Sequence, residues 1–304
     1  MKLSLKNEVP AYRIPVGRRR CRPLLGTFVE VSVGSDDQGE VNAAIDAAFA
    51  AIERVHQLMS FYDAASEVSK LNRLAVSRSV TVSDETYEVL NRAQELHKCS
   101  GGIFDITVAS ELIRKGLLPN YVGLNRQKDN CGTTMDIELL PKGRVRFLQP
   151  LCIDLGGIAK GFAVDEGIKA LRSQGVDNGF INAGGDMRGF GDHAWPICVR
   201  HPQNSGQLLP LLALKNAAFA TSANSYKRQK GCAHIHGTTR ELLPRPFSVS
   251  VRADSCLIAD ALTKVVFALE TESMSVLNMF AATVFIVYPD NRVICYAGTP
   301  PDEA

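Results

Sequence analysis

A glycine-rich segment near the middle of the chain, Asp154–Gly161 (DLGGIAKG), constrains the local fold more than any other feature. Gly156 and Gly157 carry no Cβ, so the backbone at this turn can lie close against a ligand. The N–H groups that open the following helix have no partner within that helix and favour an anion, to which Lys160 adds a positive charge. The segment has the spacing of neither GxxxxGK[ST] nor GxGxxG. It therefore predicts either a phosphate-binding turn or an ordinary tight turn from a strand into a helix.

Composition excludes several classes of protein. The chain has 304 residues, of which 45% are hydrophobic, and this is enough for a substantial core in one large unit or two ordinary domains. The net charge of +2 gives no reason to expect nucleic acid as a partner. The eight cysteines form no CxxC pair, which favours a reducing compartment over a disulfide scaffold or a zinc site.

Neither end of the chain shows the apolar pattern of a signal peptide or of a membrane span. The first 22 residues are interspersed with charges and have no apolar centre, so they do not resemble a signal peptide, and the basic run RRRCR at 18–22 is expected to be a solvated arm. The apolar stretch at 274–288 is too short to span a bilayer. We therefore expect no membrane insertion and a cytoplasmic location.

Hydrophobic periodicity predicts a mixed architecture. Alternation predicts strands, and spacings of three and four predict helices, with Ser83 and Ser255 as helix N-caps. Strands outnumber simple strand–helix alternations, so the predicted fold class is α+β. The predicted strands are 27–33, 179–181, 196–199, 247–251 and a hairpin at 283–296; the predicted helices are 41–59, 83–99, 162–175 and 255–269. One domain is predicted over 22–298, between a flexible arm at 1–21 and a tail at 299–304.

Short motifs on both sides of the glycine-rich segment come in a characteristic order along the chain. They are Leu24–Phe28 (LLGTF), Met59–Tyr62 (MSFY), Ser66–Asn72 (SEVSKLN), Gly102–Val108 (GIFDITV), the two glycine clusters at 154–161 and 182–186, Ala220–Ser222 (ATS), His234–Ile235 (HI) and Ala259–Thr263 (ADALT). Together, and in this order, they resemble the ApbE family of FAD:protein FMN transferases. The resemblance covers about 22–296, nearly the whole chain.

The resemblance implies an activity, a fold and partners. FAD would be cleaved at its pyrophosphate, AMP would leave, and FMN would be attached to a threonine or serine hydroxyl of an acceptor flavoprotein, such as a subunit of a membrane redox complex. Magnesium would assist, and two halves of an α+β unit would enclose the FAD cleft. Two alternatives keep the same site: an FAD pyrophosphatase that yields FMN and AMP, and a non-catalytic protein that binds or carries FAD. The sequence leaves the acceptor's identity and the oligomeric state open.

The resemblance assigns the general base to His234, because a neutral imidazole can take the proton of an attacking hydroxyl. The family motif is close to His-Ile-Ile-Asp-Pro-x-Thr-Gly. Only His234 and Ile235 match it well, and the chain continues with His236, Gly237 and Thr238. His236 therefore competes for the same role, although the order of the motifs favours His234.

FAD contacts follow from the same motifs. Leu25 would pack on the flavin, and the ring of Tyr62 would stack on it. Asp105 would accept from a ribose or ring N–H group, and Asp154 would either bind the ligand or hold the turn. The residues concerned are Leu25, Tyr62, Ile103, Phe104, Asp105, Asp154, Lys160 and Ile235.

The implied metal site departs from the family pattern. The carbonyl of Gly157 and the carboxylate of Asp260 would face Mg²⁺, which prefers oxygen ligands. Family members usually place Thr or Ser four residues after the aspartate, whereas this chain has Lys264 there and Thr263 one residue earlier. Either Thr263 ligates the metal, or the Lys264 ammonium lies where the metal would be. We expect the metal, because Thr263 reaches the same helix face.

Overall fold

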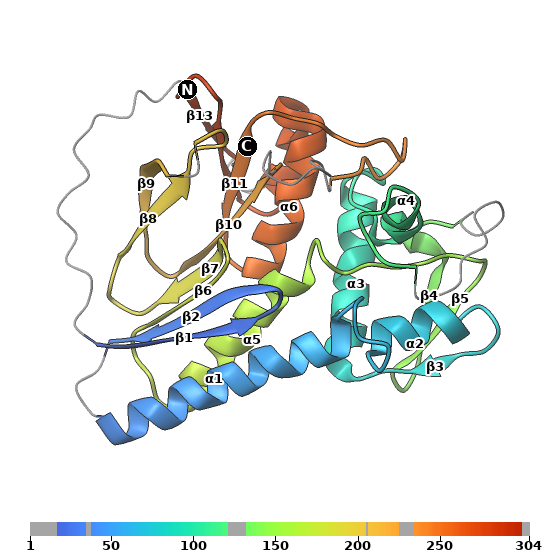
Figure 1. Cartoon of the computed structure of the whole chain (residues 1–304), viewed down its shortest axis with the longest axis horizontal. Coiled ribbons are helices and arrows are strands. Elements are labelled where there is room, and N and C mark those ends of the chain that lie inside the picture. Colours follow the sequence, from blue (N-terminus) through green and yellow to red (C-terminus); the bar gives the residue numbers. More distant parts are fainter. Residues whose placement is uncertain (1–16, 35–37, 121–131, 205, 225–233, 300–304) are drawn as a thin grey trace.

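The computed structural model describes residues 17–34, 38–120, 132–204, 206–224 and 234–299. The sequence stretches containing Cys131, Cys232 and most of both predicted tails lie outside these ranges. An antiparallel eight-stranded sheet organises the larger half of the molecule, in the order β1-β2-β6-β7-β10-β11-β12-β13 (Figure 1). Its strands are β1 (Arg18–Leu24), β2 (Thr27–Val33), β6 (Gly179–Ala183), β7 (Asp186–Phe190), β10 (Ala217–Ala223), β11 (Ser248–Ala253), β12 (Thr283–Val287) and β13 (Val293–Ala297).

Three helices pack against this sheet and against one another: α1 (Gln38–Met59), α5 (Ala159–Ser173) and α6 (Cys256–Leu269). Helix α1 lies against α5, and α5 lies against α6. The apolar positions that predicted α1 from its spacing are buried, among them Ile45, Ile52 and Met59. The N-caps are as predicted: Ser255 Oγ accepts from the N–H of Ile258, at the start of α6, at 3.3 Å.

The smaller half contains α2 (Glu67–Leu74), α3 (Asp84–Cys99) and α4 (Ala109–Arg114). They accompany a three-stranded sheet of β3 (Val80–Thr81), β5 (Arg144–Phe147) and β4 (Ile137–Leu140), on the right-hand side of Figure 1. A separate hairpin of β8 (Trp195–Arg200) and β9 (Leu208–Leu214), and the short helix α7 (Met274–Met279), complete the larger half. The antiparallel sheets and packed helices confirm the predicted α+β class.

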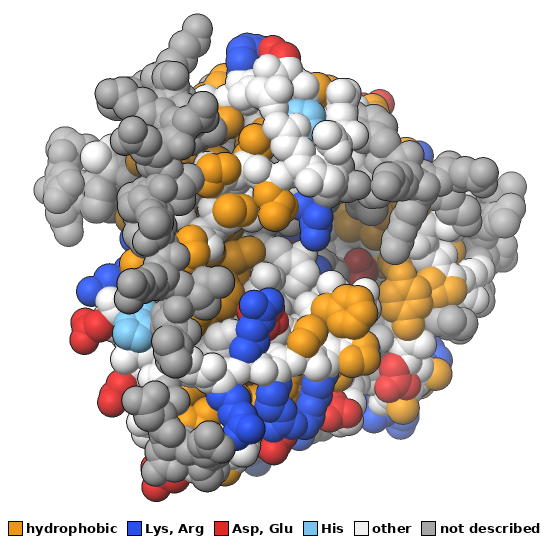
Figure 2. All heavy atoms as spheres, turned by 60° about the vertical axis from the view of Figure 1, so that its left-hand side comes forward, with side chains coloured by type: hydrophobic (Ala, Val, Ile, Leu, Met, Phe, Trp, Pro, Cys, Tyr) orange, Lys and Arg blue, Asp and Glu red, His pale blue; other side chains and the backbone are white. Residues whose placement is uncertain are grey.

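The basic run at the N-terminal side is a strand, and not the solvated arm that we predicted. Strand β1 pairs along its whole length with β2, from Arg18 opposite Val33 to Leu24 opposite Thr27. The guanidinium of Arg22 lies 4.5 Å from the Phe49 ring centre and bonds Asp46, so its stem covers helix α1. Charged side chains suit an edge strand because they discourage pairing with another chain. Figure 2 shows Lys and Arg side chains in a row on this side of the molecule.

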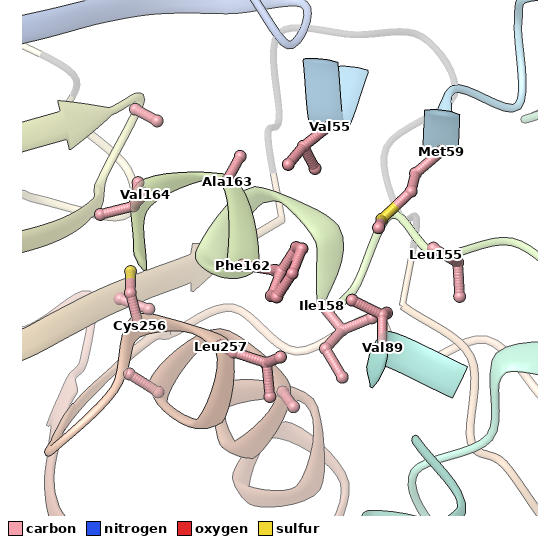
Figure 3. Packing of buried hydrophobic residues seen from close by; sticks show 14 of the residues in the cluster. Val55, Met59, Val89, Leu155, Ile158, Phe162, Ala163, Val164, Cys256 and Leu257 are labelled. Atoms are coloured by element: carbon pink, nitrogen blue, oxygen red, sulfur yellow. The ribbon is translucent and has the colours of Figure 1, made fainter. Parts of the chain in front are cut away.

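Buried apolar side chains anchor the glycine-rich turn on the side that faces the core. Leu155 and Ile158 flank the two glycines and are fully buried, and Phe162 on α5 is 2% exposed. Figure 3 shows these side chains pointing into a cluster that also receives Met59 from α1 and Leu257 from α6. The turn is therefore held between α1 and α6, and its glycines are left facing outward. Among the described residues, no helix is long and apolar enough to cross a membrane.

Candidate active site

A cavity of about 710 Å³ opens beside the glycine-rich turn. Its walls come from that turn, the end of β10, Lys264 of α6 and the segments just before and after α4. This volume falls within the range of small-molecule and cofactor sites, about 300–1,000 Å³. Most of the predicted site residues line it: Tyr62, Ile103, Phe104, Asp105, Asp154, Gly157, Lys160, His234 and Ile235. Leu25, Asp260 and Thr263 do not.

The glycine-rich turn presents backbone to the cavity. Gly156 and Gly157 line the cavity, and α5 begins two residues later. The side chain of Ile158 does not cap α5, but three N–H groups of its first turn already have partners: that of Ala159 bonds the Leu155 carbonyl, that of Gly161 bonds Asp260 and that of Phe162 bonds the Ile158 carbonyl. An anion in the cavity would therefore meet the exposed backbone of the two glycines and the charge of Lys160, and not a full set of helix-start N–H groups. Asp154 holds the turn, since its Oδ1 accepts from the Gly156 N–H at 3.2 Å, and burial raises the pKa of Asp154 to about 6. The structure thus gives Asp154 the turn-stabilising role; a contact with FAD stays a prediction.

Lys160 lies at the mouth of the cavity with a carboxylate behind it. Its ammonium forms an ion pair with Asp186 of β7, whose side chain is only 2% exposed, whereas that of Lys160 is 34% exposed. Burial works against the charged form of Lys160, but the charges of Asp186 and Asp260 outweigh it and raise its pKa. Lys160 is therefore permanently charged and directs that charge toward the cavity. Asp186, which ends the second glycine cluster, is thus the partner of Lys160.

A second ion pair lies on α6. The ammonium of Lys264 is bonded to Oδ1 of Asp260, and it also donates to the backbone oxygen of Asp260 at 3.0 Å and to Ser222 Oγ at 3.2 Å. Asp260 is fully buried, while Lys264 is 22% exposed and lines the cavity. Burial would raise the pKa of Asp260, but Lys160 and Lys264 outweigh it and hold that pKa below its ordinary value.

The residues predicted to bind Mg²⁺ do not fit a divalent ion in this arrangement. Asp260 has both oxygens engaged, Oδ1 by Lys264 and Oδ2 by the N–H of Gly161 at 3.2 Å. The Thr263 hydroxyl is buried and bonds the Asp260 carbonyl at 2.6 Å and Ser222 Oγ at 2.7 Å. A Cβ on Gly157 would lie 3.4 Å from Lys264 Cε, so the lysine side chain fills the space beside that glycine. In the described part of the chain, no three His, Cys, Asp or Glu side chains gather as a metal site.

His234 reaches the cavity from the segment between β10 and β11. Its ring centre lies 4.3 Å from that of Phe267 on α6, and it forms a hydrogen bond with the backbone of Ala223. Burial, together with the positive charge of Lys264, lowers the pKa of His234 from 6.5 to about 3. The imidazole is therefore neutral at physiological pH and retains a lone pair that can accept a proton.

His236 is turned toward its own loop. Its Nδ1 lies 3.0 Å from Thr238 Oγ1 and accepts from the N–H of Thr239 at 3.3 Å. It is not among the residues that line the cavity. Of the two histidines that the sequence left in competition, the geometry therefore favours His234.

Asp105 has a full set of partners of its own. Its Oδ1 accepts from the backbone and hydroxyl of Thr107 at 2.8 and 2.7 Å and from Thr134 Oγ1 at 2.8 Å, and its Oδ2 accepts from Arg240 at 3.0 Å. Arg240 also donates to Thr107 Oγ1 at 3.0 Å. The pair anchors the loop that carries His234 to the segment that carries Phe104. A direct bond from Asp105 to FAD stays a prediction, and the structure gives it an anchoring role instead.

Leu25 and Tyr62 differ in position. Leu25 adopts a left-handed φ of 56°, and its N–H donates to His56 Nδ1 at 3.1 Å, outside the lining of the cavity. Its contact with the flavin stays a prediction that this geometry does not favour. Tyr62 is 63% exposed at the edge of the cavity, a position from which its ring can stack on a planar ligand.

Two parts of the cavity wall were not predicted as site residues. Ser222 was noted within a motif, but its bonds to Lys264 and Thr263 depend on how β10 meets α6. Leu112, Leu117 and Leu118 form an apolar wall around the end of α4. Apolar periodicity alone would have assigned these leucines to the core, so no signal in the sequence identified them as site residues.

Comparison with known proteins assigns the chain to a family. The model of the ApbE family matches residues 25–285, which include the glycine-rich turn, the His234 loop and most of the sheet. The chain belongs to the ApbE family. The family match confirms the resemblance drawn from the ordered motifs.

Two curated relatives of this ApbE-family chain share the name FAD:protein FMN transferase. The FAD:protein FMN transferase of Vibrio cholerae is 28% identical over 266 residues, 79% of this chain and 78% of that protein. The FAD:protein FMN transferase of Treponema pallidum is 24% identical over 320 residues, 92% of this chain and 86% of that protein. These relatives are named as enzymes that act on FAD and a protein.

Solved structures have the same fold. The ApbE protein of Thermotoga maritima superposes with a TM-score of 0.75 at 27% identity, covering 91% of this chain and 96% of that one. The flavin transferase ApbE of Vibrio cholerae superposes with a TM-score of 0.76 at 24% identity, covering 94% and 99%. The α+β architecture of the chain is thus that of known ApbE structures.

Proposed function

We propose that this protein transfers the FMN moiety of FAD to a threonine or serine hydroxyl of an acceptor flavoprotein and releases AMP. The observation that carries the proposal is one cavity lined by the glycine-rich turn, two lysines and a neutral histidine. Phosphoryl transfer requires mainly positioning, charge neutralisation and an acceptor for the proton of the nucleophile. The cavity supplies all three, and the named activity of the curated relatives agrees with it.

The step needs one bond made and one broken. The acceptor's hydroxyl oxygen attacks the phosphorus of the FMN half as the bond from that phosphorus to the bridging oxygen breaks. The bridging oxygen leaves with AMP and takes the bonding electron pair. The hydroxyl proton passes to the ring nitrogen of His234, which is unprotonated before the reaction.

Binding of FAD would make His234 a better base. A pKa near 3 describes a weak base, and one cause of this value is the positive charge of Lys264. A pyrophosphate beside Lys264 and Lys160 adds negative charge near the imidazole, and this favours its protonated form. The proton would therefore be accepted most readily when FAD is in place.

Two walls of the cavity suit the remaining parts of FAD. The exposed ring of Tyr62 and the apolar side chains of Ile103 and Phe104 can hold a flat aromatic group, while Gly156 and Gly157 face the phosphates. The membrane redox complex as a source of the acceptor, and the cytoplasmic location, stay predictions.

One assay separates this proposal from its alternatives. The purified protein is incubated with FAD and an acceptor flavoprotein domain that carries a threonine, with the threonine-to-alanine acceptor as control. We expect flavin fluorescence that stays with the denatured threonine acceptor, together with one AMP per flavin attached. AMP release without a labelled acceptor would indicate a pyrophosphatase, and intact FAD would indicate a carrier; either result would contradict the proposal.

A further inference from the structure

We propose that the ammonium of Lys264 takes the place of a divalent metal ion in this protein, so that FAD is bound and cleaved without Mg²⁺. The inference deepens the proposed function and rests on it for the chemistry. It concerns the same cavity, and it reverses the expectation drawn from the sequence, in which Asp260 and Thr263 hold the metal.

The first support is the set of atoms around the ammonium. Lys264 Nζ is bonded to three oxygens: the Asp260 carboxylate, the Asp260 carbonyl at 3.0 Å and Ser222 Oγ at 3.2 Å. Carboxylate, carbonyl and hydroxyl oxygens are the donors that Mg²⁺ selects. Here they surround a lysine ammonium, which is a compact point charge with three donors.

The second support is that the other oxygens expected to bind the metal already have hydrogen-bond partners. The remaining carboxylate oxygen of Asp260 accepts from Gly161, and Thr263 is bonded to Asp260 and Ser222. A metal ion at Asp260 would have to displace Lys264 from Oδ1 or share the carboxylate with it, and in either case it would lie next to a like charge. Binding of a divalent ion is therefore opposed both by geometry and by electrostatics.

The third support is the direction of the charges. The two acids are buried, with exposures of 2% for Asp186 and 0% for Asp260, while Lys160 and Lys264 are 34% and 22% exposed and line the cavity. The positive ends of both ion pairs thus point to the side where the glycine-rich turn offers its backbone. A bound pyrophosphate would meet two ammonium groups, and its entry can replace the longest bond of Lys264, that to Ser222.

The test compares chelated and metal-loaded conditions. FAD binding is measured by flavin fluorescence, and AMP release by chromatography, each in excess EDTA and in excess Mg²⁺. We expect the unmodified protein to give the same affinity and rate in both. Lys264→Met should weaken FAD binding in EDTA and lower the rate about 10²–10³-fold, as for loss of one preorganised donor to a developing negative charge. Lys169→Met, an exposed lysine on α5 paired with Glu166, is the matched control and should change neither.

Lys264→Thr provides a second variant, because it restores the residue that the family usually has at this position. We expect it to be impaired in EDTA and to recover with Mg²⁺, which becomes free to occupy the space left by the ammonium. An unmodified protein that loses FAD binding and AMP release in EDTA, together with a Lys264→Met variant that retains them in Mg²⁺, would overturn the inference. The unmodified protein alone decides the point if either variant fails to fold.

Failure of the two proposals can be told apart. If the unmodified protein releases no AMP in either condition, the proposed function fails, and FAD binding still tests the lysine. EDTA-insensitive binding that Lys264→Met weakens supports the inference in that case. Binding that requires Mg²⁺, or that Lys264→Met leaves unchanged in EDTA, overturns it.

Discussion

The backbone N–H of Gly161 donates a hydrogen bond of 3.2 Å to Oδ2 of Asp260, a residue 99 positions later in the chain. The other oxygen of the same carboxylate holds the ammonium of Lys264. Asp260 therefore joins the first turn of α5 to α6 and at the same time positions a charge at the cavity. Together with Asp165 of α5, which accepts from the N–H groups of Cys256 and Leu257, Asp260 sets the position of the glycine-rich turn relative to Lys264.

Replacing Asp260 by Asn should test both of its roles. The amide keeps the size of the side chain but removes the negative charge, and Lys264 loses its partner. Removing one partner of a buried ion pair costs about 3–5 kcal/mol. We expect a lower free energy of unfolding in urea and weaker FAD binding, because the Lys264 ammonium is no longer fixed. Glu166→Gln, which removes an exposed partner of Lys169, should cost at most about 1 kcal/mol. Equal effects of the two substitutions would contradict this account.

The two histidines should differ sharply in the transfer assay. His234→Ala removes the proton acceptor and should lower the transfer rate about 10²–10⁴-fold, while FAD binding changes little. His236→Ala should have a mild effect, because His236 bonds its own turn through Thr238 and Thr239. The measurements are the initial rate of acceptor labelling and the dissociation constant of FAD. A severe defect in His236→Ala with a mild one in His234→Ala would reverse the assignment.

Acid should destabilise the protein through His234. Its pKa is about 3 when folded, below the ordinary value of 6.5, so protons bind the unfolded chain more readily. The stability contributed by the neutral ring is complete above pH 6.5 and is lost as the pH falls toward 3. We expect the free energy of unfolding to decline over this range, and to decline less steeply in His234→Gln. Parallel declines in the two proteins would show that His234 is not buried as a neutral ring.

Local signals in the sequence were enough for the four longest helices and for about half of the strands that the structure describes. Ser83 and Ser255 marked helix starts because a cap depends only on neighbouring backbone N–H groups. Strand β1 was missed because its basic side chains resemble a solvated arm until β2 is available to pair with it. Strand β10 (AAFATSA) was missed because small residues give no clear alternation; its place in the sheet is fixed by β7 and β11 on either side.

The part of the site that depends on local spacing could be predicted from the sequence, and the part that depends on contacts between distant segments could not. Helical spacing placed Lys264 on the same face as Asp260, one turn later. Whether a metal or the lysine occupies that face depends on Ser222 from β10 and on Gly157 from the turn before α5. These contacts join segments that lie far apart in the chain, so no local pattern could supply them. The same holds for Asp105, whose partner Arg240 is 135 residues away.

Arg240 should be essential for holding the His234 loop. Its guanidinium bonds Asp105, whose side chain is 1% exposed, and also Thr107. Arg240→Met leaves a buried carboxylate without its cation, a change that typically costs about 3–5 kcal/mol. We expect a clearly lower melting temperature and slower transfer, since the loop is no longer tied to the Phe104 segment. Arg292→Met, which breaks an exposed pair with Asp290, should leave both unchanged. A melting temperature that Arg240→Met does not lower would show that the anchor is dispensable.

Gly161 should not tolerate even one added carbon. A Cβ at this position would lie 2.2 Å from the backbone oxygen of Cys256, so α5 and α6 would have to move apart. That movement would stretch the Gly161–Asp260 bond and carry the glycine-rich turn away from Lys264. Overpacking of this kind costs about 1–3 kcal/mol, occasionally more. We expect Gly161→Ala to lower the melting temperature and to weaken FAD binding together. Gly206→Ala is the matched control, since a Cβ there would lie 3.5 Å from its nearest neighbour, an ordinary contact. Unchanged melting and FAD binding in Gly161→Ala would mean that the separation of the two helices does not set the geometry of the site.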